Sequence, residues 1–359
     1  MGLSAFFLYL AFRKSDWNQT WTVIQNVGFS WILVSMPLLA LAFWFRALRW
    51  RYLLLPAGRP GLHSLFGSIM IGFMSLNLLP LRLGEFIRAY VLGRREGLSK
   101  SGVFATVVIE RIYDGFTVLL LLVLALIFLT LPLSREVKAW VKAFTYLGAV
   151  IYLGAVVFLI TARQKTGLII RVIRWLLQPW PRWQKRAAEV IGSFAAGLAS
   201  LGDWRIFLVV TGYSLLVWLA TAAFYWVVMF GFQSGGEGSL GRQVGPFGGV
   251  FVLVAIALGI MIPSGPGFVG TFELACIMAL VGLGVNRTTA ESYAIVVHAV
   301  QFIPISLVGI IYLYVQNFSF REIRAGGETA QAEMAGAGSR CGGDPRPEFG
   351  EGSMGDKKT

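Results

Sequence analysis

Hydrophobic residues fall into eight runs along the chain, separated by short basic or polar stretches. The runs cover residues 3–12, 31–45, 65–81, 103–131, 143–160, 206–232, 247–285 and 289–318. A helix needs about 20 apolar residues to cross the hydrocarbon core of a bilayer. The runs at 206–232 and 289–318 exceed that length, and the run at 143–160 is close to it. The pattern therefore predicts an all-α polytopic membrane protein.

The run at 65–81 does not have the pattern of a simple membrane span. It contains several helix-breaking or polar residues and leads directly into charged ones: Gly67, Gly72, Asn77, Pro80, Arg82 and Glu85. The basic stretches 46–63 and 82–100 flank it, and basic loops favour the cytoplasmic side of a membrane. For both stretches to lie on that side, the run must enter and leave the bilayer on the same side. It is therefore predicted to form a re-entrant helical hairpin.

The long run at 247–285 is interrupted in a similar way, by a segment rich in proline and glycine at 263–270. A second re-entrant hairpin here, entering from the outside, completes the topology. About six crossing helices and two opposed hairpins then form a weak inverted repeat. Both termini are expected on the cytoplasmic side of the plasma (inner) membrane.

Composition agrees with this architecture. Hydrophobic residues make up 56% of the 359 residues and charged residues only 14%, against about 25% in a soluble domain. The net charge of +13 comes mostly from short basic runs between apolar segments, such as 46–51. That distribution is typical of loops beside anionic lipid head groups and does not favour nucleic acid as a partner. Two cysteines, Cys276 and Cys341, exclude a disulfide framework or a cysteine zinc site.

Two stretches differ from the membrane segments. Residues 166–202 combine an amphipathic, arginine-bearing pattern with three tryptophans and two prolines, which is typical of a helix lying in the membrane interface. From residue 325 the chain is rich in Gly, Ala, Glu and Asp and has almost no large apolar residues. Such a segment cannot bury enough surface to fold. The predicted organisation is a transmembrane domain at 1–320 and a disordered cytoplasmic tail at 321–359.

The two broken helices are also the best candidates for a binding site. Backbone without helical hydrogen bonds is tolerated at membrane depth only where protein or a water-filled cavity covers it. The helix that begins after each break directs its N–H groups and positive dipole end into that cavity, which suits an anionic group. The residues concerned are Asn77, Pro80, Arg82, Gly84, Glu85 and Arg88 in the first break, and Pro263, Pro266, Gly267, Gly270 and Glu273 in the second.

A third polar cluster lies in the run at 103–131. Glu110, Arg111 and Asp114 are three or four residues apart, so their side chains can converge near one face of a helix. Ionisable residues inside a membrane segment commonly face a cavity and bear on function. The competing interpretation is an ion-pair lock that only holds helices together. No metal site, cofactor or catalytic residue is predicted, and His63 and His298 have no neighbouring ligand pattern.

These three motifs, in this order and spacing, resemble the lysylphosphatidylglycerol synthase transmembrane region, also called the flippase-like membrane family. The similarity extends from residue 3 to residue 318 and includes Arg49 and Trp50. The resemblance implies a bilayer-embedded domain that moves or handles a lipid. Full-length synthases of this type also carry a soluble aminoacyl-transferase domain, for which this sequence has no counterpart. The resemblance therefore implies the lipid-handling part without lysyl transfer.

Two functions compete at this point. The first is a lipid transporter or flippase that holds an anionic phospho- or glycolipid with Arg82, Arg88 and Arg111 as counter-charges. Its partners would be membrane lipids and, as a further candidate, a lipid-modifying enzyme. The second is a membrane enzyme acting on a lipid-linked sugar or phosphate, for which Asp16 and Asp114 are the candidate acids. No phosphate-binding motif of the G-x-x-x-x-G-K-[ST] type occurs, so nucleotide hydrolysis by this chain is not predicted.

Overall fold

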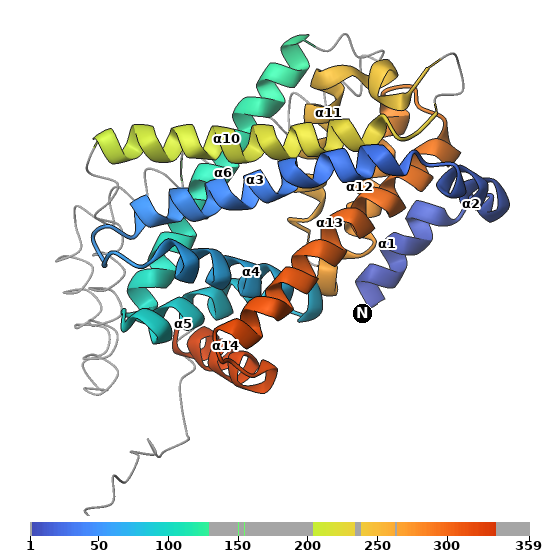
Figure 1. Ribbon diagram of the computed structural model, residues 1–359. Coiled ribbons are helices and arrows are strands. Elements are labelled where there is room, and N and C mark those ends of the chain that lie inside the picture. Colours follow the sequence, from blue (N-terminus) through green and yellow to red (C-terminus); the bar gives the residue numbers. More distant parts are fainter. Residues whose placement is uncertain are drawn as a thin grey trace, which may run out of the picture.

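The computed structural model describes residues 2–128, 204–233, 238–262 and 264–334, together with residues 150 and 154. Within these ranges every secondary-structure element is a helix (Figure 1). The helices are α1 (Gly2–Phe12), α2 (Trp17–Gln25), α3 (Phe29–Leu53), α4 (Leu62–Leu78), α5 (Gly84–Glu96), α6 (Lys100–Phe128), α10 (Trp204–Met229), α11 (Leu240–Gly259), the short 3-10 helix η2 (Pro266–Phe268), α12 (Thr271–Gly282), α13 (Arg287–Val315) and α14 (Phe320–Met334). The predicted all-α fold is confirmed. The predicted segments at 143–160 and 166–202 lie outside the described residues.

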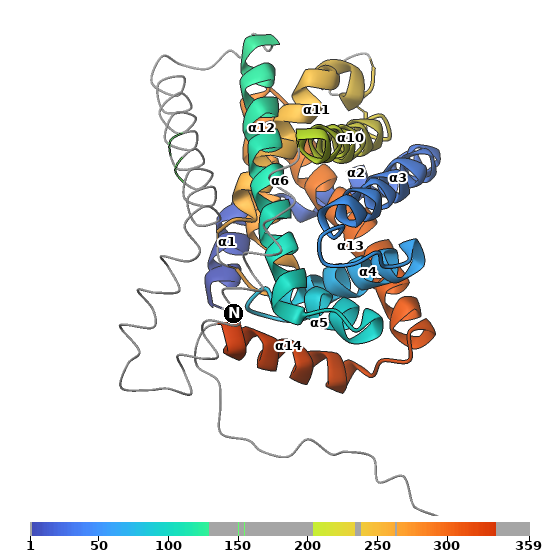
Figure 2. The same ribbon diagram turned by 90° about the vertical axis from the view of Figure 1, so that its left-hand side faces the viewer.

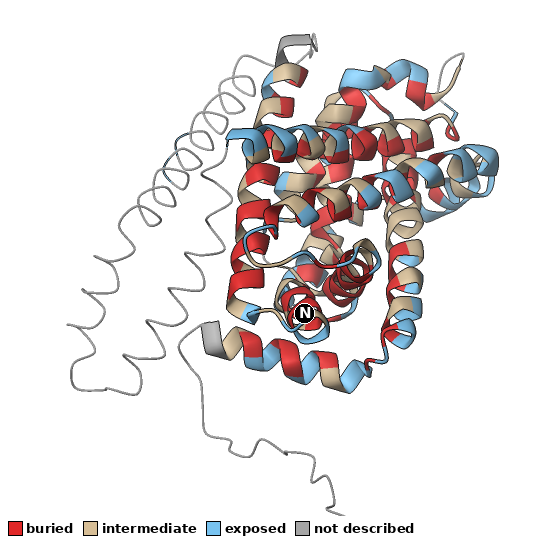
Figure 3. Cartoon of the chain, turned by 60° about the vertical axis from the view of Figure 1, so that its left-hand side comes forward, coloured by how far each residue is buried: buried red, intermediate tan, exposed pale blue. Residues whose placement is uncertain are grey.

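Among the described residues, four helices are long and apolar enough to cross a membrane: α3, α10, α11 and α13. Helices α3 and α10 pack side by side (Figure 1). Buried residues line the inner faces of the helices, while large apolar residues such as Leu33, Leu216 and Ile311 stay exposed (Figure 3). An apolar outer surface of this kind is stable against lipid tails and not against water. The chain is an integral membrane protein.

Helices α4 and α5 form the first predicted hairpin. The chain turns back at residues 79–83, where Leu81 and Arg82 adopt left-handed backbone conformations with φ of 60° and 55°. Gly84 begins α5 directly against the backbone carbonyl of Gly72 in α4. The two open ends also meet, because the Cα of Gly58 faces the side chain of Leu98. The hairpin therefore returns to the level at which it started.

Helices α11 and α12 form the second hairpin, joined by residues 260–270 and the short helix η2. Gly259 of α11 packs against Ala275 of α12 near the turn. At the open end, the Gln243 side chain donates a hydrogen bond of 3.4 Å to the carbonyl of Gly284. This hairpin also begins and ends at one level.

The turns of the two hairpins touch each other. Arg82 in the first turn donates a hydrogen bond to the carbonyl of Ile260 in the second. Its guanidinium also lies 5.6 Å from the centre of the Phe268 ring in η2, and α4 packs against η2. Two hairpins that meet turn to turn point toward each other from opposite sides. This is the opposed arrangement that the inverted repeat predicts.

The structure differs from the prediction at residues 321–334. A disordered tail was expected from residue 321, but α14 continues to Met334 and runs beneath α5 (Figure 2). Its inner face consists of Ile323 and small residues, with Gly326 against the ring of Tyr90 and Gly327 against Ile87. Small residues bury little surface each, yet they let two helices approach closely. The remaining part of the predicted tail, residues 335–359, lies outside the described residues.

Candidate functional site

A buried ionic network lies where α3, α5 and α6 meet. The carboxylate of Glu110 in α6 is fully buried and forms an ion pair with two arginines, one at each oxygen. Arg49 Nη2 of α3 lies 2.8 Å from Oε1, and Arg88 Nη2 of α5 lies 2.5 Å from Oε2. The guanidinium of Arg88 also stacks on Trp50, at 3.7 Å from the ring centre. Charges buried this deeply are stable only when they are paired, and here each one is.

Asp114, one helical turn beyond Glu110, extends the network to α10. Its Oδ1 accepts hydrogen bonds from Arg49 Nη1 at 2.7 Å and from the indole N–H of Trp218 at 3.0 Å. Arg46 lies farther away, with Nη1 3.8 Å from Oδ2. Asp114 therefore holds α3, α6 and α10 together from inside the bundle.

Arg111 and Glu85 form the more open edge of the same network. The Arg111 side chain is 37% exposed and the Glu85 side chain 23% exposed. Arg111 lies 3.5 Å from the Glu85 carboxylate and 3.4 Å from that of Asp114. Within the described residues, four arginines (46, 49, 88 and 111) face three carboxylates (85, 110 and 114) in this cluster, which leaves a net charge of +1.

The first broken helix places its polar residues at the junction of the hairpins. The amide of Asn77 donates 2.9 Å to the hydroxyl of Ser306 in α13. Pro80 and Arg82 are exposed in the turn that follows. Gly84 is buried and serves the packing of the hairpin itself, because a Cβ there would lie 2.7 Å from the backbone nitrogen of Leu76.

The second broken helix places a carboxylate and an imidazole together. Gly270 has a φ of +96°, and the chain enters α12 from it. Its N–H donates 2.7 Å to Oε2 of Glu273, three residues later. The other oxygen of Glu273 lies 2.6 Å from Nδ1 of His298 in α13. On its far side, Nε2 of His298 lies 3.0 Å from the carbonyl oxygen of Gly267.

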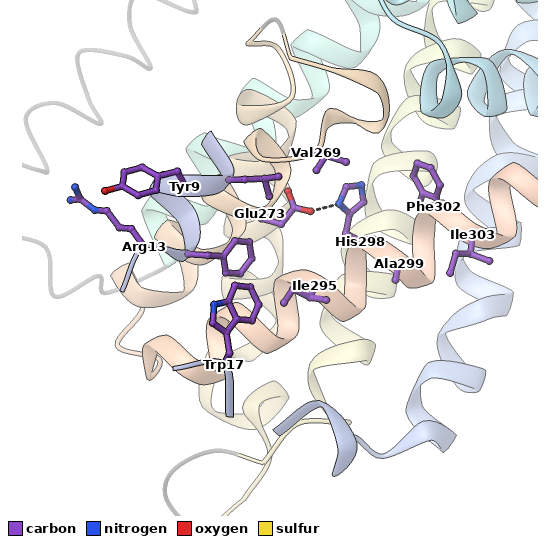
Figure 4. A pocket seen from close by; sticks show the side chains of 12 residues that line it. Tyr9, Arg13, Trp17, Val269, Glu273, Ile295, His298, Ala299, Phe302 and Ile303 are labelled. Atoms are coloured by element: carbon purple, nitrogen blue, oxygen red, sulfur yellow. Dashed lines mark hydrogen bonds and ion pairs between the residues drawn. The ribbon is translucent and has the colours of Figure 1, made fainter. Parts of the chain in front are cut away.

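A cavity of about 690 Å³ opens beside this pair (Figure 4). Its walls are mostly apolar and come from α1, the start of α2, the turn before α12 and the middle of α13. Glu273 and His298 lie at its centre, Tyr9 and Arg13 at one end, and Phe302 and Ile303 at the other (Figure 4). The arrangement offers a long apolar space with a cation at one end.

The predicted site residues thus separate into three places. The ionic network contains Glu85, Arg88, Glu110, Arg111 and Asp114. The hairpin junction contains Asn77, Pro80 and Arg82. The turn beside the cavity contains Pro266, Gly267, Gly270 and Glu273. Pro263 lies outside the described residues. The structure does not bring Arg82 and Arg88 to one point, because Arg88 faces the buried network and Arg82 faces the second hairpin.

Sequence reasoning gave three contributors no role in the site. Arg46 and Arg49 were assigned to a basic loop, but α3 continues through them to Leu53 and buries both side chains. Their spacing of three residues beside Trp50 was the available signal, since it continues one face of the preceding helix. His298 was set aside because no ligand pattern surrounds it in sequence, and its partner Glu273 is 25 residues away.

The comparisons with known proteins agree with this architecture. Residues 1–309 match the family model for the lysylphosphatidylglycerol synthase TM region. The chain belongs to this family. A protein of Methanothermobacter thermautotrophicus, described as a UPF0104 membrane protein, is 25% identical over 262 residues. The match covers 70% of this chain and 74% of that relative. No solved structure matches the chain.

Proposed function

We propose that this family member is a transporter of an anionic phospho- or glycolipid, with the junction of the two hairpins as its gate. Paired broken helices mark the substrate site in many transporters, because their turns must be covered by protein or by a polar cavity. Here the two turns cover each other through Arg82. This turn-to-turn contact is the observation that carries the proposal.

The charge distribution around the gate supports an anionic substrate. Arg82 is exposed, and its guanidinium bonds to a backbone carbonyl. One helical turn further on, Glu85 contacts Arg111 at the open edge of a network with a net charge of +1. A phosphate or carboxylate head group entering from this edge meets a net positive surface, and arginine forks suit such oxyanions.

The apolar cavity supports a lipid over a soluble anion. We propose that it holds an acyl chain, since its walls are nearly all hydrocarbon and Arg13 stands at one end. A chain placed there would lie along α13, between Arg13 at one end of the cavity and Ile303 at the other. The proposed location is the plasma membrane, with both termini on the cytoplasmic side.

The alternative, a membrane enzyme acting on a lipid-linked sugar or phosphate, gains less support from its candidate acids. Asp114 is buried and bonded to Arg49 and Trp218. Asp16 caps α2 by accepting the backbone N–H groups of Asn18 and Gln19. Both carboxylates are therefore engaged in holding the fold.

Lipid co-purification tests the substrate class. The full chain and its Arg82→Gln variant are purified in mild detergent, and bound lipids are identified by mass spectrometry. The matched control is Arg324→Gln, which changes an arginine of α14 that is 58% exposed and paired with Glu328. We expect enrichment of anionic lipid with wild type and the control, and loss of that enrichment with Arg82→Gln at unchanged thermal stability. Equal lipid profiles for all three proteins would contradict the proposal.

A further inference from the structure

The contact between Glu273 and His298 restricts where the protons of the two side chains can lie. His298 is anchored on both sides, with Nε2 3.0 Å from the Gly267 carbonyl and Nδ1 2.6 Å from a Glu273 oxygen. A carbonyl oxygen can only accept a hydrogen bond, so Nε2 must carry a hydrogen and donate it. In a neutral imidazole that hydrogen leaves Nδ1 as a bare acceptor.

A bare Nδ1 and an ionised carboxylate cannot approach to 2.6 Å, because two lone pairs would then face each other. One further proton must therefore lie between the two atoms, either on Nδ1 as imidazolium or on Oε1 as carboxylic acid. The pair holds this proton in a mostly apolar setting, with side chains 12% and 9% exposed. Phe272 stacks on the imidazole at 4.2 Å, and the second Glu273 oxygen is occupied by the Gly270 N–H.

The other titratable groups around the pair are few in the part of the chain that the structure describes. Tyr9 and Arg13 line the cavity from α1 and the segment after it. Cys276 lies one turn further along α12, and Tyr225 of α10 contacts the Phe272 ring at 6.4 Å. From the first hairpin, Arg82 reaches Phe268 of η2. None of these groups lies between Nδ1 and Oε1, so none can take the place of the proton in that contact.

The pair also connects the turn of the second hairpin to the junction of the two hairpins. The carbonyl of Gly267 is held by His298, and the Cα of the same residue faces the Asn77 carbonyl of α4 and the Phe302 ring. We propose that Glu273 and His298 form a proton-binding site that locks the second hairpin turn, so that loss of the proton opens the turn beside the cavity. The proposal rests on the transporter function given above and supplies its coupling ion.

The proposed step is a simple dissociation. The shared proton leaves to water, the carboxylate keeps its negative charge and the imidazole becomes neutral. The neutral imidazole then has one hydrogen for two contacts. On Nδ1 that hydrogen keeps the bond to Glu273 and leaves a lone pair on Nε2 facing the Gly267 carbonyl at 3.0 Å, so this carbonyl is released. Rebinding one proton restores both bonds.

Glu273→Gln removes the proton and keeps the geometry. The amide oxygen of glutamine can accept from Gly270, and its NH₂ can donate to a bare Nδ1, while Nε2–H still donates to Gly267. The variant should therefore fold and stay in the locked arrangement at every pH. Glu328→Gln is the matched control, since it removes a carboxylate from α14 that is 51% exposed and far from the cavity along the chain.

Nitrogen-15 NMR of labelled histidines measures the proton without any transport assay. The chain has two histidines, and His63→Gln assigns the other signal to His298. We expect the His298 nitrogen signals of wild type and Glu328→Gln to move as pH rises from mildly acidic to alkaline. The signals of Glu273→Gln should stay those of the Nε2–H tautomer. Wild-type signals identical to those of Glu273→Gln at every pH, or an Nε2 without hydrogen at mildly acidic pH, would overturn the proton site.

Lipid movement in vesicles then tests the coupling. If loss of one proton opens the gate, the rate of lipid movement by wild type should change by about tenfold per pH unit. This holds over the pH range in which most molecules still hold the proton. Glu273→Gln should give a slow, flat profile. A steep profile that survives Glu273→Gln would refute the lock. If wild type moves no lipid while His298 still titrates, the transporter function fails and the proton site stands.

Discussion

Neutralising Glu110 should destabilise the protein far more than neutralising its neighbour Arg111. Glu110→Gln leaves two buried guanidinium groups, Arg49 and Arg88, without the carboxylate that both contact at 2.8 Å or less. Removing one partner of a buried ion pair costs about 3–5 kcal/mol, because the stranded charge stays out of water. Arg111 is 37% exposed, so contact with water can replace part of the stabilisation that Arg111→Gln removes. Pairs that solvent reaches contribute only about 0–1 kcal/mol.

The assay is thermal unfolding in detergent, monitored by exposure of buried cysteine, since Cys276 is buried. The double variant Arg88→Gln with Glu110→Gln removes a positive and a negative charge together. It should recover part of the stability that Glu110→Gln loses, which identifies the loss as a stranded charge. Equal melting temperatures for Glu110→Gln and Arg111→Gln, or no recovery in the double variant, would refute this reasoning.

Two further predictions concern the hairpins. Gly84→Ala should lower stability by about 1–3 kcal/mol, because the new Cβ meets the Gly72 carbonyl, whereas Gly212→Ala, where nothing lies within 4 Å, should be neutral in the same melting assay. Single cysteines at positions 59 and 94, in a background lacking Cys276 and Cys341, should react with an impermeant reagent from one side of the membrane and a cysteine at 284 from the other. Labelling of positions 59 and 94 from opposite sides would exclude the first hairpin.

The hairpins could be predicted from the sequence because their causes are local. Proline and glycine break each helix within a few residues, and the basic stretches around the first break restrict which side it returns to. The contact between the two turns was not predicted. The atoms involved, such as Arg82 and the Ile260 carbonyl, are 178 residues apart and leave no local signal.

The ionic network and α14 show where hydropathy fails. The hydropathy run ends at residue 45, but α3 continues to Leu53. Asp114 and Glu110, from a distant part of the chain, balance the charges of Arg46 and Arg49 in this continuation. For α14 the misleading feature was composition. Glycine and alanine suggest disorder when counted, yet at Gly326, Gly327 and Ala330 they form one face that packs on α5.

The most direct test of the transporter proposal is movement of a labelled lipid by the purified full chain in vesicles. A fluorescent anionic phospholipid is placed in both leaflets, and a membrane-impermeant quencher reports how much reaches the outer one. We predict that wild type lets the quencher reach nearly all of the label, chemically unchanged, while Arg82→Gln leaves the inner half protected. A label that stays protected with wild type, or that is recovered as a converted product, would contradict the account.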